Sequence, residues 1–177
     1  MDLEPVMEKI TERLIFLVEN SNFTKRQLAE SVNISRQRLY SILNKRKNTY
    51  PKVFTCCKLS ISLKVPPEIF FNLSMPENDL LGHPINRSIE QYQIDLIENV
   101  RLIRKIKSQD LEFNLTYEKM CEELNYFYRE QPYNILVPDI KRLVRLFSGK
   151  YEMRLDTLVS ISLIFQEPLE VFFERRK

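Results

Sequence analysis

The sequence predicts an all-α fold built from two similar helical units, and three observations support this. Glycine is scarce, with only Gly82 and Gly149 in 177 residues, and the alternation of apolar and polar residues typical of β-strands is weak. Apolar residues recur instead at helical spacing. Finally, residues 55–71 (TCCKLSISLKVPPEIFF) reappear without a gap as residues 157–173 (TLVSISLIFQEPLEVFF), with Thr, Ser, Pro, Glu and Phe-Phe at fixed offsets. We therefore expect two tandem units, a covalent pseudo-dimer.

The bulk composition is that of an ordinary folded protein. Hydrophobic residues make up 44% of the chain and charged residues 29%, so a packed core is expected. The longest wholly apolar run, residues 14–18, is far too short to span a bilayer, and the acidic amino-terminal stretch lacks a signal-peptide core. We expect a cytoplasmic protein with no membrane partner.

The cysteines and the histidine give no sign of a metal centre. Cys56 and Cys57 are neighbours, Cys121 stands alone, and no C-x-x-C spacing occurs. His83 is the only histidine, so a zinc site lacks its usual ligands. A Gly-rich phosphate loop and a nucleophile paired with histidine are also missing from the sequence. We expect buried core cysteines, no metal, no cofactor and no enzymatic activity.

Apolar spacing and capping residues predict three helices at the start of the chain. Residues 5–20 carry apolar side chains at helical intervals. Thr24 can cap a second helix, in a capping box with the glutamine three residues later. Asn33 tolerates the left-handed conformation of a tight turn. Ser35 can cap a third helix that ends near Asn44. A helix, a short turn and a second capped helix form the helix-turn-helix layout.

The stretch TKRQLAESVNISRQRLYSILNKRK, residues 24–47, resembles the helix-turn-helix of the Cro/phage-repressor (XRE-like) family. Ala29 stands where that family requires close helix approach, and Ile34 fills the apolar position of the turn. Asn33 replaces the glycine that the family usually has there. The resemblance covers residues 5–72 and implies a five-helix DNA-binding domain ending in PPEIFF. It also implies a bacterial, phage or plasmid origin.

Basic side chains gather on the two helices that would face DNA. Residues 24–47 hold seven Lys or Arg and one acid. A recognition helix enters the major groove by its amino-terminal end, where Arg pairs with guanine and Gln with adenine. The predicted base contacts are Arg36, Gln37 and Arg38. Phosphate contacts position a domain without reading sequence; those predicted, with Lys25 implied by the family resemblance, are Lys25, Arg26, Ser35, Tyr40, Asn44, Lys45, Arg46 and Lys47. The alternative is a merely solvated basic face.

Net charge differs between the two halves of the chain. Residues 1–72 carry 12 Lys/Arg and 7 Asp/Glu, a net charge of +5, whereas residues 73–177 carry 15 and 17, a net charge of −2. The basic first half favours polyanion binding there. Residues 73–88 hold two prolines and a glycine and are predicted to be a linker. The expected domains are therefore residues 1–72 and 89–177.

A long helix is expected after the linker, over residues 89–107. It exceeds what the first helix of such a domain needs, so the excess is either a linker spine or a dimerisation surface. Its predicted apolar positions are Ile89, Leu96, Ile97, Val100, Ile103 and Ile106.

A degenerate second copy of the helix-turn-helix unit is predicted within residues 89–175. Thr116 repeats Thr24 as a helix cap, and Asn125 repeats Asn33 as the turn residue. The register then breaks over the tyrosine-rich residues 126–136, which form a wing, a ligand pocket, a protein contact or simple packing. The remaining correspondences place Met120, Cys121 and Leu124 in the core. Asp139 takes the place of the capping residue Ser35, and Ile140-Lys141 take the place of the base-reading pair Arg36-Gln37. The candidate DNA contacts of this unit are Lys141, Arg142, Arg145 and Lys150.

These features predict a two-unit helix-turn-helix transcription regulator that reads the major groove with helix 35–44. The family resemblance implies a repressor rather than an activator. Its expected partners are double-stranded DNA and a second copy of the chain as a homodimer, with a protein partner through the second unit as a further option. The alternative is a protein-interaction module on the same fold. Such a module would be a phage or mobile-element inhibitor of a host protein, or an antagonist of another regulator.

Overall fold

The computed structural model describes residues 3–44, 50–109, 115–129 and 138–175. All the secondary-structure elements within these residues are helices. The first half contains α1 (Leu3–Glu19), α2 (Lys25–Ser31), α3 (Arg36–Leu43), α4 (Val53–Ser62) and α5 (Pro67–Phe70). The second half contains the 3₁₀ turn η1 (Glu77–Asp79), α6 (Ile89–Gln109), α7 (Tyr117–Arg129), α8 (Ile140–Phe147), α9 (Leu155–Phe165) and the 3₁₀ segment η2 (Leu169–Phe173). The all-α prediction is confirmed for these residues. None of their helices is long and apolar enough to cross a membrane.

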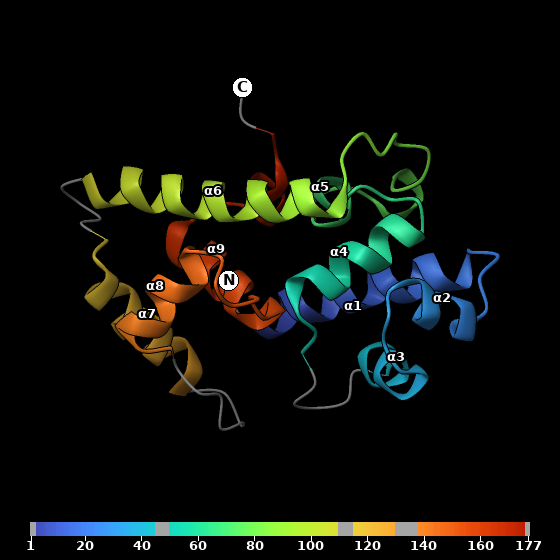
Figure 1. Ribbon diagram of the computed structural model, residues 1–177, viewed down its shortest axis with the longest axis horizontal. Helices are drawn as coiled ribbons and strands as arrows, with labels where there is room; N and C mark the ends of the chain where they lie inside the picture. The colour runs from blue at the N-terminus through green and yellow to red at the C-terminus, as the bar shows by residue number, and fades with distance from the viewer. Residues whose placement is uncertain (1–2, 45–49, 110–114, 130–137, 176–177) are drawn as a thin grey trace.

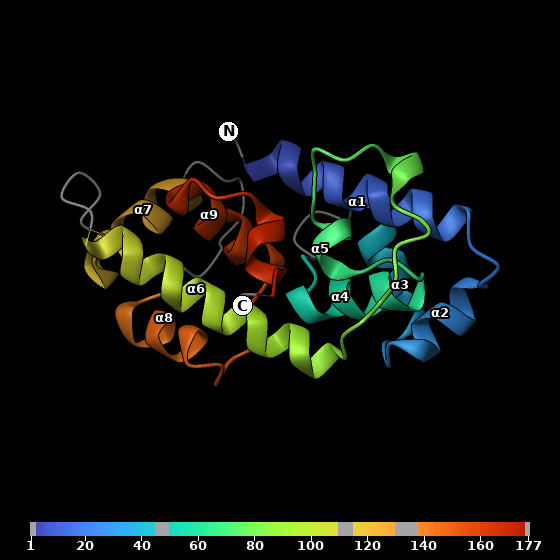
Figure 2. The same cartoon turned by 90° about the horizontal axis from the view of Figure 1, so that it is seen from above.

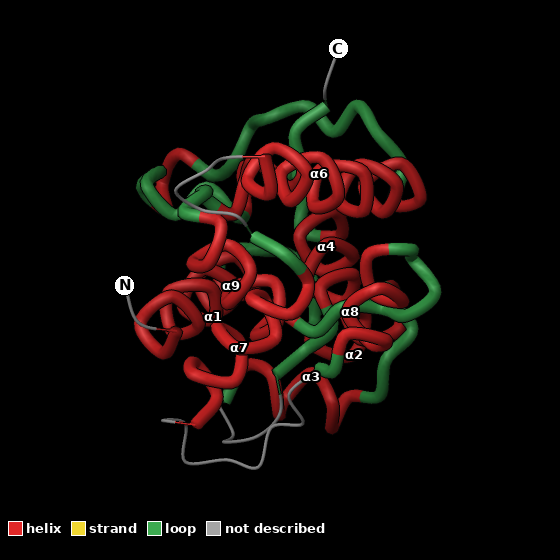
Figure 3. The backbone as a smooth tube through the Cα atoms, turned by 90° about the vertical axis from the view of Figure 1, so that its left-hand side faces the viewer, coloured by secondary structure: helices red, strands yellow, loops and turns green. Residues whose placement is uncertain are grey.

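The two halves of the chain lie side by side and pack against each other. Figure 1 shows α1–α4 on the right and α7–α9 on the left, with α6 along the upper side. In the view from above in Figure 2, α1 and α6 run along opposite sides of the molecule. Figure 3 shows the same arrangement from one end, with α6 at the top and α3 near the bottom. The first helix of each half contacts the other half, because α1 packs against α9 and α6 packs against α4.

The predicted helix starts are confirmed by their capping hydrogen bonds. The Gln27 backbone N–H donates to Thr24 Oγ1 at 3.2 Å and the Thr24 N–H donates to Gln27 Oε1 at 2.9 Å, which closes the capping box. Asn33 has a φ of 56° and makes the tight turn into α3. Ser35 and Asp139 each accept a backbone N–H from the first turn of α3 and α8, at 3.1 and 2.7 Å.

The helices α1 and α6 bury matching faces. When they are aligned at their first residues, four pairs of buried apolar positions coincide: Val6 with Tyr92, Ile10 with Leu96, Leu14 with Val100, and Leu17 with Ile103. The same alignment pairs two buried polar residues, Arg13 and Asn99. Arg13 donates to the Phe70 carbonyl at 3.0 Å, and Asn99 donates to the Phe172 carbonyl at 3.1 Å. Because Phe70 and Phe172 are equivalent in the repeat, the two helices make the same anchoring contact.

The backbones of the two repeats also bond to each other reciprocally. Extending the gap-free alignment of the repeats backwards pairs Pro51 with Met153 and Val53 with Leu155. The Val53 N–H donates to the Met153 carbonyl, and the Leu155 N–H donates to the Pro51 carbonyl, both at 2.9 Å. Such exchange between equivalent positions is typical of an isologous interface between two subunits. Here it lies inside one chain.

An aromatic cluster fills the space between the repeats. Phe71 stacks on its repeat counterpart Phe173, with ring centroids 4.5 Å apart and an interplanar angle of 7°. Phe70 meets the edge of Phe71 at 4.9 Å. All three side chains are fully buried. The Phe-Phe pair that occurs in both repeats thus forms one core shared by the two halves rather than two separate cores.

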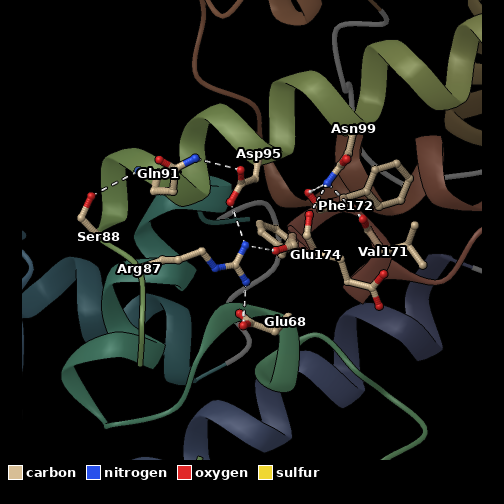
Figure 4. Close-up of polar contacts among 10 residues, drawn as sticks. Glu68, Arg87, Ser88, Gln91, Asp95, Asn99, Val171, Phe172 and Glu174 are labelled. Carbon is tan, nitrogen blue, oxygen red and sulfur yellow. Dashed lines mark hydrogen bonds and ion pairs between the residues drawn. The ribbon is translucent and has the colours of Figure 1, made fainter. Parts of the chain in front are cut away.

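Arg87, near the end of the predicted linker, ties the halves together through a buried polar network (Figure 4). Its guanidinium bonds to Glu68 of α5 at 2.6 Å and to Asp95 of α6 at 2.7 Å, and it donates to the Phe173 carbonyl at 2.7 Å. Gln91 donates to the other oxygen of Asp95 at 3.0 Å. Since Leu80 is also fully buried, residues 73–88 are packed onto the fold at two points.

The turn predicted at Asn125 is wrong, because α7 continues through this residue to Arg129. Tyr128, in the last turn of α7, is only 4% exposed, and its hydroxyl donates to Thr157 Oγ1 at 3.4 Å. Burial of this ring against α9 favours a longer helix than the first unit has. The predicted interruption over residues 126–136 therefore begins as helix, and its remainder from residue 130 lies outside the described residues.

Most predicted core positions are buried, but several are not. Met120, Leu124 and the neighbouring cysteines of α4 are buried as predicted. Cys121 of α7 and Ile89 and Ile97 of α6 are only partly buried. Ile106 is 52% exposed, because it lies beyond Ile103, the last buried residue of α6. The carboxy-terminal end of α6 therefore extends past the core.

Gly149 and Gly82 provide a matched pair for testing how α8 packs on α6. Both have positive φ, 75° and 88°, so alanine should cost about 1–2 kcal/mol at either position. A Cβ at Gly149 would also lie 2.7 Å from Ile97 Cδ1, whereas nothing lies within 4 Å of one at Gly82. We expect urea unfolding to show a larger loss for Gly149→Ala than for Gly82→Ala. Equal losses would mean that Ile97 moves aside freely.

Candidate nucleic-acid interface

The exposed face of α3 is determined by the turn that precedes it. Leu28 and Ala29 of α2 and Leu39 of α3 are fully buried, and the Ile34 N–H donates to the Ala29 carbonyl at 3.0 Å. This bond closes the end of α2 and is made possible by the positive φ of Asn33. One side of α3 is buried in the core, and the opposite side faces solvent.

The three predicted base contacts do not have the same environment. Arg36 and Gln37 lie on the first turn of α3 with exposed side chains. Arg38 is only partly exposed, and its guanidinium donates to the Tyr50 carbonyl at 3.2 Å. This bond holds Arg38 against the chain that leads into α4, so its geometry suits bracing α3 better than reaching a base.

Lys25, Arg26 and Tyr40, three of the predicted phosphate contacts, form a connected surface. Lys25 Nζ at the start of α2 lies 5.1 Å from the centroid of the Tyr40 ring on α3, a cation–π contact between the two helices. Arg26 pairs with Glu30 at 2.8 Å, but both side chains are largely exposed, at 70% and 62%. An exposed pair of this kind contributes little to stability, so a phosphate could displace Glu30 at small cost.

Ser35 and Asn44 mark the two ends of α3. The Ser35 hydroxyl accepts the Arg38 N–H and so is engaged as the helix cap. Asn44 follows the last turn with an exposed side chain, and its N–H donates to the Tyr40 carbonyl at 2.9 Å. The predicted contacts Lys45, Arg46 and Lys47 lie outside the described residues.

The basic residues predicted in the second unit lie on and after α8, far from α3 in Figure 1. Lys141, Arg142 and Lys150 are exposed. Arg145 is also exposed, but it donates to the Tyr151 hydroxyl at 3.2 Å. The structure therefore presents two separate sets of predicted contacts rather than one combined site.

Two exposed apolar residues of α8 were not among the predicted site residues. Ile140 is 40% exposed and Val144 is 44% exposed. When α8 is aligned with α3 at the capping residues, they take the positions of Arg36 and Tyr40. The repeat alignment carried this signal for Val144, because it pairs an aliphatic residue with a tyrosine expected to contact DNA.

The cysteines of α4 are part of the core. Burial raises the pKa of Cys56 to about 12 and also raises the pKa of Cys57, so both thiols stay protonated at neutral pH. Over the residues that the structure describes, no group of three or more His, Cys, Asp or Glu side chains is placed to hold a metal ion.

The surface of α2 and α3 is thus an exposed basic face on a capped, tightly turned helix pair. Compared with known proteins, the chain matches no family model, no curated protein and no solved structure.

Proposed function

We propose that the chain is a sequence-specific DNA-binding transcription regulator, a repressor, built as two tandem five-helix helix-turn-helix units. The observation that carries this proposal is the placement of Arg36 and Gln37. Both side chains are exposed on the first turn of α3, directly after the left-handed residue Asn33 and the cap Ser35. A helix presented in this way enters the major groove by its amino-terminal end, where Arg recognises guanine and Gln recognises adenine.

The surroundings of α3 support this role. Lys25 and Tyr40 contact each other across α2 and α3, and both side chains are exposed, so they can meet the phosphate backbone. Arg38, bonded to the Tyr50 carbonyl, supports the orientation of α3. In this proposal Arg36 and Gln37 read bases, whereas Lys25, Arg26, Tyr40 and Asn44 position the domain.

The reciprocal contacts between the repeats support an internal pseudo-dimer. Helix-turn-helix proteins commonly bind two half-sites about 34 Å apart. Either the two units of one chain or two chains in a homodimer would provide that spacing. The higher positive charge of residues 1–72 makes the first unit the main reader.

Arg36→Ala tests base reading. Using duplexes selected by the wild-type protein from a random library, we expect a loss of about 1–3 kcal/mol in binding free energy and relaxed preference at one base pair. The loss follows from removing two hydrogen bonds to a base edge. Arg175→Ala, which removes an exposed arginine far from α3, is the control. Unchanged affinity and preference for Arg36→Ala in a folded protein would contradict the assignment.

Lys25→Ala tests phosphate anchoring. Binding to selected and to random duplexes should weaken equally, because a phosphate contact carries no sequence information. The slope of log K against log[salt] should become shallower by about one unit, as expected for one fewer counterion released. Titrations at four or more salt concentrations measure this slope. A loss confined to the selected duplex would show instead that Lys25 acts through the base-reading residues.

The second candidate function, a protein-interaction module, is favoured by the exposed aliphatic pair Ile140 and Val144 on α8. Both functions are compatible in one chain, because the two helices present different surfaces.

A further inference from the structure

The second unit lacks several of the basic and polar side chains with which the first unit is predicted to contact DNA. Aligning α7 with α2 at Thr116 and Thr24, and α8 with α3 at their caps, gives the exchanges Lys25 to Tyr117, Arg26 to Glu118, Ser35 to Asp139, Arg36 to Ile140 and Tyr40 to Val144. Tyr117 does not replace the lost charge, because its ring is packed against Phe147 at 5.8 Å and beneath Arg104 at 4.3 Å. An aliphatic pair at these two positions cannot make the base-edge and phosphate contacts predicted for Arg36 and Tyr40.

The same surface presents apolar side chains next to a row of cations. Ile140 and Val144 are one turn apart on α8, and Lys141 and Arg145 form a parallel row beside them. Tyr151, 51% exposed, continues the surface, because Arg145 bonds to its hydroxyl at 3.2 Å and lies 5.8 Å from its ring centroid. We call these five residues the α8 face.

An open hollow of about 530 Å³ adjoins the amino-terminal end of the α8 face. It is lined by Cys121, Asn125, Pro138, Asp139, Ile140 and Lys141. The exposed apolar side of Ile140 and the stem of Lys141 thus border a concave surface, which a bulky apolar side chain of a partner could fill. α8 has eight residues, or about 12 Å of helix, so the complementary segment needs only two to three turns.

We propose that the α8 face binds an acidic amphipathic helix of a partner protein. The apolar side of that helix would cover Ile140, Val144 and Tyr151, with one large side chain in the hollow. Its carboxylates would pair with Lys141 and Arg145, and Lys150 lies close in the chain to extend the basic side. A contact of this size is below the roughly 800 Å² per partner of a standard interface, so a micromolar dissociation constant is expected. The inference does not depend on DNA binding by the first unit.

Synthetic helices test the proposal with the full-length protein. The probe is a set of fluorescein-labelled peptides of about 14 residues, roughly 20 Å as helix, with leucines along one side and glutamates along its flanks. The matched set carries lysine in place of each glutamate. Fluorescence anisotropy should show saturable binding of the acidic set at micromolar concentrations and at least tenfold weaker binding of the lysine set. No saturation by any acidic peptide up to about 1 mM, or equal binding of both sets, would overturn the proposal.

Variants locate the site. Val144→Ser and the double variant Lys141→Glu/Arg145→Glu should each weaken acidic-peptide binding at least about tenfold, while Val144→Leu retains it. The control is Ile94→Ser, which removes an equally exposed aliphatic residue (47%) from α6. An equal loss for Ile94→Ser would show non-specific apolar binding. If the α8 variants instead weaken binding to the selected duplex as much as Arg36→Ala does, and that duplex displaces the peptide, the α8 face binds DNA and the proposal fails.

Discussion

Replacing Phe71 by alanine should destabilise the whole protein by about 3–5 kcal/mol, the usual cost of truncating a fully buried phenylalanine. Phe71 has no exposed surface and stacks on Phe173 at 4.5 Å, with the edge of Phe70 against it at 4.9 Å. Because the stack joins the two repeats, a single cooperative transition should shift in chemical denaturation. A variant in which only one half unfolds earlier would show that the halves are stable independently.

Two controls separate this interface from burial in general. Phe23→Ala removes a ring that is 38% exposed and should have a much smaller effect. Phe173→Ala should cost as much as Phe71→Ala, and the double variant should cost less than the sum of the two, since each single change already removes the stack. Strict additivity would mean that the two rings act separately.

Replacing Arg87 by methionine should destabilise the protein by about 3–5 kcal/mol, because it leaves buried carboxylates without their partner. Asp95 is only 7% exposed and Glu68 is partly buried. Burial alone would lower the pKa of Arg87, but its hydrogen bonds to Glu68 and Asp95 outweigh burial and raise that pKa. The folded state therefore stabilises the charged form of the guanidinium, and the uncharged methionine cannot pair with the two carboxylates. Urea unfolding of the full-length variant measures the loss.

The triple variant Glu68→Gln/Arg87→Met/Asp95→Asn is the matched test of that reasoning. It removes the charges together, so it should be more stable than Arg87→Met alone, although it contains more changes. If the triple variant is the less stable of the two, packing of the Arg87 side chain rather than charge pairing accounts for the effect. In that case the cation–π contact of Arg87 with Tyr92, 4.2 Å from the ring centroid, is the next contact to examine.

Local signals in the sequence were sufficient to predict the first three helices of the chain. Thr24 and Ser35 cap α2 and α3 as predicted because capping depends on side chains within three residues of the helix start. Asn33 adopts positive φ for a reason equally local, the tolerance of asparagine for that conformation. The same reasoning failed at Asn125, where a contact between distant residues, Tyr128 and Thr157, favours continued helix.

For the candidate site, the sequence could predict which side chains are exposed. Exposure of Arg36 and Gln37 follows from helical periodicity, because Leu39 and its neighbours on the opposite side must be buried. Whether an exposed cation is available is not a local property. Arg38 bonds to Tyr50 and Arg145 to Tyr151, and each partner comes from a segment beyond the helix.

By itself, the sequence determined the all-helical class, the internal repeat and the capped helix pair, since each depends on residues a few positions apart. Only the tertiary structure decided that the repeats share one core. The Phe71–Phe173 stack, the reciprocal bonds of Val53 and Leu155, and the position of Arg87 between the halves join residues far apart in the chain. No local pattern specifies such contacts, because they form only where burying apolar surface and pairing charge between distant segments outweigh the entropy of bringing those segments together.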